Sequence, residues 1–452
     1  MRPEGHAPIP ASVCLLLWVL IGAVGIVAAD DDRPDIHLIV VDTLRADHVG
    51  AWGYQREVTP NLDRLAGQSL VFWQAVSSAP YTPSATASIL TGLYPMVHGI
   101  RTVRADMEVG VEVMRPGVRT IAMELGRLGY QTMGVAGNPW IRKERGYARG
   151  FDRFVEVSDG QSLQREVNRL AVGLWKERDG RPLFMYLHVM DVHAPYERGW
   201  NVHPSVGELG PMPDEYVREI DHPERIHNAT GWNGERRLER IVDAYDTGIR
   251  GWDDAFGEYL VLIGREKLLE SVVVVVVSDH GEEFEDHGRW SHGQSLYEEL
   301  IHVPLVVYAP AAGIRGVRDE TVCTVQIMPT LLALATGEDR AGSLLRWAGN
   351  QTCFAEVETD AEAGPLRPMH FQYVARTGKD KAYHQGGKTR IYDLNCDPKE
   401  RHPRRVSGTM VEEELWKWRT ECQSLAGTLG YGDAVELSES VVERLKALGY
   451  GR

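Results

Sequence analysis

The stretch VVVVVVSDHGEE, residues 272–283, runs from six valines directly into a serine, a carboxylate and an imidazole. A run of β-branched residues this long is typical of a strand that is covered on both faces, as in a parallel sheet packed between helices. Polar residues that follow such a strand lie at the carboxyl edge of the sheet, where open α/β sheets bind their ligands. The stretch therefore predicts a buried strand with Asp279 and His280 at a candidate site.

Three other apolar segments end in polar residues in the same way. IHLIVVD ends at Asp42, and YQTMGVAGN ends at Asn138. PLFMYLHVMDVH carries Asp191 and His193 just beyond its apolar part. Segments with helical patterning separate these strands: TPNLDRLAGQ, TIAMELGRLG and RLERIVDAYDTGIRGWDDAFGEYLVLIG. Strands that alternate with helices predict an α/β fold, a large, mostly parallel sheet sandwiched by helices, with all these polar endings on one edge.

The pattern changes after residue 337. CFAEVE, MHFQYVART and TRIYDLNCDP have the composition of short strands joined by turns, and LSESVVERLKALGY has that of a final helix. We therefore predict two parts of the exported chain. An α/β domain spans residues 35–337, and a C-terminal subdomain over residues 338–452 contains a small antiparallel sheet and the terminal helix.

The first residues of the chain predict export. Arg2 precedes an apolar run over residues 11–29 that ends in small residues, which is typical of a secretory signal peptide cleaved after Ala29. The run is also long enough to remain as a single membrane anchor, which is the alternative interpretation of residues 1–29. Under both interpretations the rest of the chain is periplasmic or extracellular, or is anchored in a membrane and faces outside.

The cysteines agree with an oxidising compartment. One of the 5 cysteines lies in the apolar run, and the others form an even set of four, Cys323, Cys353, Cys396 and Cys422. One or two disulfides are therefore expected, and the sequence leaves their pairing open.

The charge of the chain excludes one class of partner. The formal net charge is −15, and no basic stripe appears in the sequence. A nucleic-acid-binding surface requires such a stripe to contact phosphates. We therefore expect no nucleic-acid partner.

A second stretch of interest is SSAPYTPSATASILTGLYP, residues 78–95. A loop rich in serine, threonine and proline leads into a helix predicted over residues 84–91, and Gly92 closes it. The start of a helix presents unpaired backbone N–H groups and the positive end of the helix dipole, which together favour a tetrahedral oxyanion. The hydroxyl of Thr82 would face the same anion. Taken alone, the stretch also fits an ordinary capped helix.

Seven blocks of sequence together resemble one family. They occur in the order HLIVVDTLRADHVGAWGY, TPNLDRLA, TPSATASILTGLYPMVHG, LHVMDVHAPY, SDHGEEFEDHG, HGQSLYEELIHVPLVVYAP and IYDLNCDP. In these blocks the chain resembles the sulfatase family of the alkaline phosphatase superfamily, from about Asp35 to the terminal ERLKALGY. The resemblance implies a catalytic α/β domain, a metal at the edge of the sheet, and a nucleophile that also contacts the metal.

The resemblance also implies roles for individual residues. The metal ligands would be Asp42, Thr82, Asp279 and His280. The catalytic residues would be Thr82 as nucleophile, His193 near the leaving group, and His292 where members place a substrate-binding Lys or His. We expect Asn138, at the end of its strand, to contact the anion of the substrate.

The sequence departs from the family pattern at the nucleophile. Sulfatases share a Cys-x-Pro-x-Arg motif, in which the Cys, or a Ser in its place, is oxidised to formylglycine. This chain instead has the sequence TPSAT from Thr82 to Thr86. A threonine cannot give that aldehyde, because its oxidation yields a ketone. Thr86 replaces the motif arginine, and Thr43 replaces the second carboxylate of an Asp-Asp pair. An unmodified Thr nucleophile resembles instead the phosphoethanolamine and glycerophosphate transferases and some phosphodiesterases of the superfamily.

These residues give three hypotheses. The first is an exported, metal-dependent hydrolase of phosphate or phosphonate esters, including diesters, which acts through Thr82 on a small-molecule, glycan-derived or lipid-derived anionic ester. The second is a sulfatase that does not use formylglycine, and the third is a non-catalytic protein that binds anionic glycans. A site of two carboxylates, a hydroxyl and an imidazole favours one Mn²⁺ or Zn²⁺ ion, whereas Ca²⁺, the usual sulfatase ion, prefers an all-oxygen shell and remains an alternative.

Other residues near these motifs are expected to support the site. We interpret His188 as a core histidine and Arg45 as the residue that holds the Asp42 loop through a salt bridge. The acids of EEFED are expected to be solvated, with Glu282 as an alternative support for the metal. A second metal at Asp191, His193 and His292 is a minor variant. Substrate specificity is assigned to loops within residues 200–237.

Overall fold

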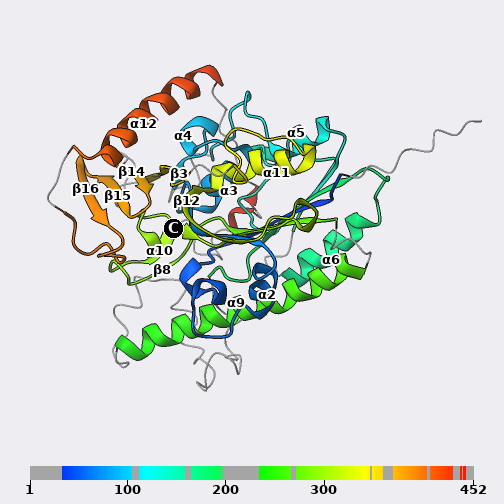
Figure 1. Ribbon diagram of the computed structural model, residues 1–452, viewed down its shortest axis with the longest axis horizontal. Coiled ribbons are helices and arrows are strands. Elements are labelled where there is room, and N and C mark those ends of the chain that lie inside the picture. Colours follow the sequence, from blue (N-terminus) through cyan, green and yellow to red (C-terminus); the bar gives the residue numbers. More distant parts are fainter. Residues whose placement is uncertain are drawn as a thin grey trace, which may run out of the picture. The chain divides into compact units, whose positions relative to one another are not determined.

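Figure 1 shows the computed structural model of the chain. It describes residues 33–103, 111–157, 164–194, 196, 234–265, 271–346, 349–359, 370–404, 408–430, 438–439 and 441–443. The predicted signal or anchor, most of the predicted specificity loops, and most of the predicted terminal helix lie outside these residues. Among the helices that are described, none combines the length and the apolar character that a membrane span requires.

A 9-stranded sheet forms the centre of the molecule (Figure 1). Its strand order is β10-β2-β11-β7-β1-β6-β4-β5, and β12 pairs with β2. The strands are β1 (Ile36–Val41), β2 (Leu70–Val76), β4 (Gln131–Ala136), β5 (Arg153–Glu156), β6 (Leu183–Val189), β7 (Val273–Ser278), β10 (His302–Val303), β11 (Leu305–Tyr308) and β12 (Gly316–Cys323). Only β10 and β11 pair in antiparallel fashion. The predicted mostly parallel sheet is therefore confirmed.

Helices cover both faces of this sheet, as predicted (Figure 1). One layer contains α2 (Pro60–Ala66), α6 (Gln164–Trp175) and α9 (Gly234–Arg265), and the other contains α3 (Thr82–Thr91), α5 (Ile121–Arg127) and α11 (Ile327–Thr336). Shorter elements join them: η1 (Ala46–His48), η2 (Gly50–Trp52), α4 (Pro95–His98), η4 (Lys143–Arg145), β8 (Glu283–Phe284), β9 (Trp290–Ser291), α10 (Glu298–Ile301), η7 (Pro310–Ala312) and η8 (Thr324–Gln326).

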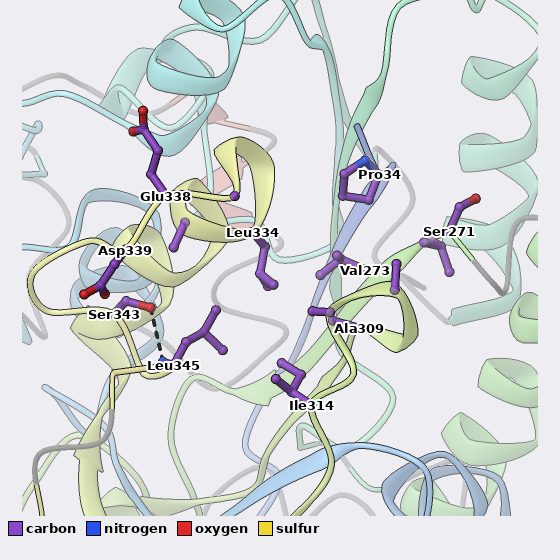
Figure 2. A pocket seen from close by; sticks show the side chains of 15 residues that line it. Pro34, Ser271, Val273, Ala309, Ile314, Leu334, Glu338, Asp339, Ser343 and Leu345 are labelled. Carbon is purple, nitrogen blue, oxygen red and sulfur yellow. Dashed lines mark hydrogen bonds between the residues drawn. The ribbon is translucent and has the colours of Figure 1, made fainter. Parts of the chain in front are cut away.

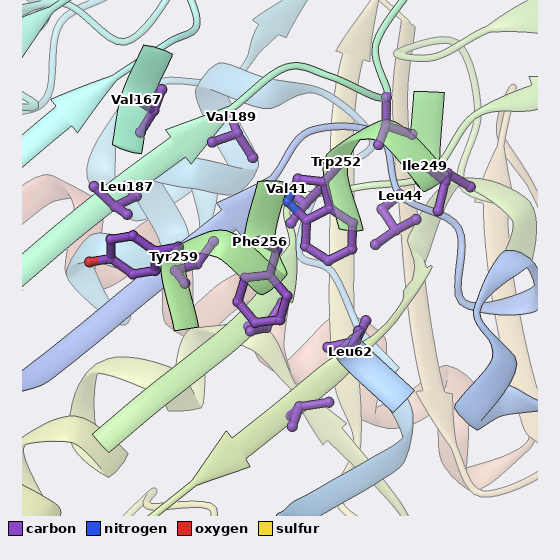
Figure 3. Close-up of a cluster of buried hydrophobic side chains, with 14 of the residues drawn as sticks. Val41, Leu44, Leu62, Val167, Leu187, Val189, Ile249, Trp252, Phe256 and Tyr259 are labelled. Carbon is purple, nitrogen blue, oxygen red and sulfur yellow. The ribbon is translucent and has the colours of Figure 1, made fainter. Parts of the chain in front are cut away.

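The valine run explains why helices are needed on both faces. Successive side chains of a strand point to opposite faces, so the run divides between two hydrophobic clusters. Val274 and Val276 belong to the cluster that contains Trp252 and Phe256 of α9, whereas Val275 belongs to the cluster on the other face. Figure 3 shows the aromatic side chains of α9 packed over β1 and β6. Both clusters keep apolar surface from water and thereby stabilise the central strands.

A second sheet of five strands has the order β16-β15-β14-β13-β3. Its strands are β3 (Thr102–Val103), β13 (Cys353–Thr359), β14 (His370–Thr377), β15 (Asp380–Gln385) and β16 (Lys388–Asp393), and α12 (Met410–Thr428) packs against it. The predicted small antiparallel sheet is confirmed, and the sequence did not predict that β3 joins it in parallel. A disulfide between Cys323 and Cys353 connects the end of β12 to the start of β13.

An apolar cavity of about 430 Å³ lies at the amino ends of the central strands (Figure 2). Pro34 and Val273 line it where β1 and β7 begin, together with Leu334 and Leu345. The polar residues that follow β1 and β7 lie at the opposite ends of these strands. The cavity is therefore separate from the predicted site.

Candidate active site

The register of the sheet brings the first two predicted metal ligands together. β1 pairs in parallel with β7, and Val41 is opposite Ser278. The next residues of the two strands, Asp42 and Asp279, are therefore neighbours at the carboxyl edge. Both side chains are fully buried.

Thr82 and His280 complete this group. Oγ1 of Thr82 lies 3.0 Å from Nε2 of His280 and 3.3 Å from Oδ1 of Asp42. The same imidazole nitrogen lies 3.8 Å from Asp42 and 3.7 Å from Asp279. The structure thus gathers four predicted residues from three separate parts of the chain within a few ångströms of one another.

The start of α3 places the hydroxyl of Thr82 in this group. The helix begins at Thr82, two residues earlier than predicted, because Pro83 occupies a first-turn position that needs no backbone N–H donor. The preceding Tyr81 is extended, with φ −151°. Gly92 ends the helix in the left-handed region at φ 67°. Every residue of the helix is buried, so Thr82 is held at a fixed position.

The residues present fit a divalent metal ion. Asp42, Asp279 and His280 each offer a ligand atom, and these atoms lie within 4.8 Å of one another. Oδ2 of Asp279 is buried and has no hydrogen-bond partner among the described residues. Burial raises the pKa of Asp279 well above its usual range, and the charge of Asp42 raises it further. A cation between the two carboxylates would offset both effects, and would use the unpaired oxygen.

The imidazole of His280 presents the correct nitrogen for such a cation. Its Nδ1 lies 2.8 Å from the carbonyl oxygen of Gly281, so Nδ1 carries the proton and Nε2 keeps its lone pair. Burial lowers the pKa of His280 to about 3, which keeps the ring neutral at neutral pH. A neutral imidazole whose other nitrogen donates to a carbonyl is the usual form of a metal-bound histidine.

Asn138 and His188 both contact Asp42. Nδ2 of Asn138 donates a hydrogen bond of 2.6 Å to Oδ2 of Asp42. The predicted contact of Asn138 with a substrate anion stays a prediction. Nε2 of His188 lies 3.2 Å from the same oxygen, and its Nδ1 is 3.0 Å from the hydroxyl of Tyr186. His188 is buried, as predicted, but it also orients the carboxylate of Asp42. The sequence signal for this second role was its place in the strand beside β1.

His193 and His292 lie next to this group. The ring of His292 is 4.5 Å from the ring of His280 and 5.1 Å from the ring of His193, measured between centroids. Asp191 instead accepts a hydrogen bond from the backbone of Gln164 at 2.7 Å. Across the described ranges, one group of three or more side chains has metal-ligand spacing, and it consists of Asp42, Asp279 and His280.

One expectation about the following loop is wrong. Glu282 and Glu283 are fully buried, whereas the sequence predicted solvated acids, with support of the metal as the alternative for Glu282. Glu282 contacts His292 and Tyr196, and Glu283 accepts a hydrogen bond from Gln294. These partners come from segments that fold back over the loop, so a local run of acids could not reveal them.

Arg45 holds the loop after Asp42, as predicted. Its guanidinium forms ion pairs with Asp47 and Asp286, both at 2.8 Å. It also donates to the backbone oxygen of Glu282 at 3.0 Å. Arg45 therefore connects the loop that carries Asp42 to the loop that carries His280.

The two positions that depart from the family pattern lie inside the protein. Thr43 follows Asp42 with a left-handed φ of 57°, and its hydroxyl is buried. Neither the hydroxyl of Thr43 nor that of Thr86 has a hydrogen-bond partner in the part of the chain that the structure describes. Both therefore place a small, neutral group where the family motif has a charged one.

Comparisons with known proteins identify the family of this chain. A family model described as Sulfatase matches residues 34–337. An arylsulfatase of Clostridium perfringens is 26% identical over 443 residues, which cover 81% of this chain and 89% of that protein.

Two solved structures share the fold. A 2-O GAG sulfatase superposes with a TM-score of 0.69 at 20% identity, over 89% of this chain and 95% of its own. A phosphonate monoester hydrolase of Agrobacterium radiobacter superposes with a TM-score of 0.62 at 17% identity, over 88% and 96%. With a family match across most of the folded chain, this protein belongs to the sulfatase family and is a hydrolase of sulfuric or phosphoric esters.

Proposed function

We propose that the protein hydrolyses phosphate or phosphonate esters, including diesters, through Thr82 as the nucleophile. The observation that carries this proposal is the position of Oγ1 of Thr82, 3.0 Å from Nε2 of His280 and 3.3 Å from Asp42. A hydroxyl at this position can share a metal ion with the carboxylates and the imidazole, and so become nucleophilic at neutral pH.

The reaction then proceeds in two displacements. A bound metal ion would lower the pKa of the Thr82 hydroxyl and neutralise charge on the ester oxygens. Oγ1 releases its proton to solvent and forms a bond to phosphorus, while the bond from phosphorus to the alcohol oxygen breaks. His193 gives a proton to the departing oxygen. Water then bonds to phosphorus, the bond to Oγ1 breaks, and the proton that the water loses restores the hydroxyl of Thr82.

We propose Mn²⁺ or Zn²⁺ as the metal ion. The neutral Nε2 of His280 is the deciding donor, because imidazole suits these ions. Ca²⁺ prefers a shell of oxygen atoms only, and would use the hydroxyl and carboxylates without the imidazole.

Sulfate-ester hydrolysis is the second candidate, since the similar protein of Clostridium perfringens is an arylsulfatase. Thr82 cannot form the aldehyde of formylglycine, whose hydrate releases sulfate readily. A sulfated Thr82 would therefore be hydrolysed slowly, which favours the phosphorus esters as substrates.

The test is a panel of matched p-nitrophenyl esters, a phosphate diester, a phosphonate monoester and a sulfate, assayed with metal-free protein reloaded with Mn²⁺, Zn²⁺ or Ca²⁺. The expected result is the highest kcat/KM on a phosphorus ester with Mn²⁺ or Zn²⁺. Fastest turnover of the sulfate with Ca²⁺ would contradict the proposal. Stoichiometric metal binding without turnover of any ester would favour the non-catalytic hypothesis.

We also propose that the protein works outside the cytoplasm. The disulfide between Cys323 and Cys353 supports this, because such bonds persist in oxidising compartments. Expression of the full chain, followed by cell fractionation and mass spectrometry of its N-terminus, would separate cleavage after Ala29 from a retained anchor. Recovery of the uncleaved chain in the cytoplasm would contradict the proposal.

A further inference from the structure

Glu282 is buried between a site histidine and a tyrosine. Its Oε1 lies 3.0 Å from Nδ1 of His292, and its Oε2 accepts a hydrogen bond of 2.8 Å from the hydroxyl of Tyr196. The side chain of Glu282 is 0% exposed and that of His292 is 3% exposed, so water does not compete for this contact. Arg45 fixes the backbone of Glu282 through its carbonyl oxygen. The carboxylate is therefore held from both sides and from its main chain.

This contact selects one tautomer of His292. A carboxylate at Nδ1 accepts a hydrogen bond from that nitrogen, and a histidine that donates through Nδ1 exchanges protons with other groups through Nε2. The ring of His292 lies beside the ring of His280, with centroids 4.5 Å apart and planes tilted by 38°, and His280 contacts Thr82. The imidazole of His280 thus connects His292 to the nucleophile Thr82.

We infer that Glu282 is a positioning residue, which holds His292 so that its Nε2 takes a proton from the water of the second displacement. The inference rests on the proposed function of Thr82. In this step a proton moves from water to Nε2 of His292, the water oxygen bonds to phosphorus, and the bond between phosphorus and Oγ1 of Thr82 breaks with its electron pair on Oγ1. The carboxylate of Glu282 stabilises the imidazolium that forms, as a buried acid does for a catalytic histidine.

Glu282 should act mainly on the second half of the reaction. Formation of the bond between Thr82 and phosphorus uses the hydroxyl, the metal ligands and His193, whereas the carboxylate of Glu282 is hydrogen-bonded to His292 and Tyr196. Removal of Glu282 should therefore leave the first displacement fast and slow the second. The covalent adduct on Thr82 would then accumulate.

Pre-steady-state kinetics on Glu282→Ala tests this. With the p-nitrophenyl ester that the wild type turns over best, we expect a burst of one p-nitrophenol per protein. The steady rate that follows should be about a hundredfold slower than wild type, the usual contribution of a positioned base. Intact-mass measurement should show the phosphoryl or phosphonyl adduct, and peptide mapping should place it on Thr82. An equal loss in both phases, with no adduct, would overturn the inference.

The matched control is Glu283→Gln. Glu283 is the neighbouring buried acid of the same loop, but it contacts Gln294 and the backbone of His287 and Arg289 rather than His292. This variant should show no burst and no adduct. A burst in both variants would mean that disturbing the loop is enough, and would also overturn the inference.

Nuclear magnetic resonance of the chain labelled with ¹⁵N-histidine measures the tautomer of His292 without turnover. The wild type should show His292 protonated at Nδ1, with the signal assigned by its loss in His292→Gln. Glu282→Ala should shift this ring towards the Nε2–H form. A wild-type ring protonated at Nε2 alone would overturn the inference. If the wild type turned over none of the esters, the proposed function and the role of His292 as a base would both be wrong. The ¹⁵N signal of His292 would still show whether Glu282 sets its tautomer.

Discussion

Oγ1 of Thr82 lies 3.0 Å from Nε2 of His280, although 198 residues separate the two in the sequence. His280 follows the carboxyl end of β7, and Thr82 is the first residue of α3. The start of a helix therefore meets the end of a buried strand, and a hydroxyl meets an imidazole whose lone pair faces it. This relationship makes Thr82 a candidate nucleophile rather than an ordinary helix-capping residue.

The substitution Thr82→Ala should abolish turnover without unfolding the protein. Loss of a nucleophile typically lowers kcat by about a thousandfold or more. The hydroxyl of Thr82 does not cap α3, so the melting temperature should change little. Steady-state kinetics and thermal unfolding measure the two effects. Ser84→Ala is the control, because the Ser84 hydroxyl has no hydrogen-bond partner in the described structure, and its removal should leave kcat near the wild-type value.

The substitution Gly281→Ala should weaken metal binding. A Cβ atom at Gly281 would overlap the backbone oxygen of Glu299, so the loop that carries His280 must shift. A displaced metal ligand commonly costs about 10-fold to 100-fold in metal affinity. Isothermal titration with Mn²⁺ or Zn²⁺ measures this loss. A Cβ atom at Gly251 meets no neighbour within 4 Å, so Gly251→Ala in α9 should bind metal normally, and equal affinities in both variants would contradict the assignment of His280 as a ligand.

The carboxylate of Asp253 should make stability depend on pH. Burial raises the pKa of Asp253 to about 6, although the backbone N–H groups of Asn61 and Leu62 oppose this. The unfolded chain loses this proton near pH 4, whereas the folded protein keeps it to about pH 6. Asp253 therefore contributes to the free energy of unfolding at low pH. This contribution, up to roughly 3 kcal/mol, is lost as the pH rises from about 4 to 6.

Urea unfolding of wild type and Asp253→Asn between pH 4 and pH 7.5 isolates this effect. The free energy of unfolding of the wild type should fall relative to that of the variant as the pH rises. If the difference in the free energy of unfolding between the two proteins stays constant over this range, the pKa of Asp253 is not raised.

The disulfide between Cys323 and Cys353 should stabilise the protein without contributing to catalysis. It closes a loop with a sequence separation of 30 residues, for which loop entropy predicts about 3 to 4 kcal/mol. Cys353→Ser should lower the midpoint of urea unfolding accordingly, while kcat of the folded protein stays close to wild type. Cys396 is exposed and unbonded, so Cys396→Ser is the matched control and should have no effect on the midpoint.

Four of the central strands could be predicted because each has a continuous apolar run. β1, β4, β6 and β7 are buried at every position, so their composition alone identifies them. β12 is mostly exposed over its first half, and β15 contains charged residues at a sheet position that buries Lys381. Such strands are defined by their pairing partners. The sequence therefore did not distinguish them from loops.

Supporting residues of the site were harder to predict than its candidate ligands. The acids of EEFED have the composition of a solvated loop, yet Glu282 is buried against His292 and Tyr196. His188 was expected in the core, and its contact with Asp42 depends on the pairing of β6 with β1. His188 and Asp42 are 146 residues apart in the sequence, and Glu282 and Tyr196 are 86 residues apart.

The sequence by itself determined that a parallel sheet would end in Asp42, Asn138, Asp279 and His280 along one edge, because apolar runs and the parallel direction of strands fix which ends meet. Only the tertiary structure decided that Thr82 turns its hydroxyl towards that edge, that Cys323 pairs with Cys353, and that Glu282 holds His292. Strand ends follow from local patterns of apolar residues. Contacts between side chains of separate segments depend on how helices and loops pack in three dimensions, which no local pattern specifies.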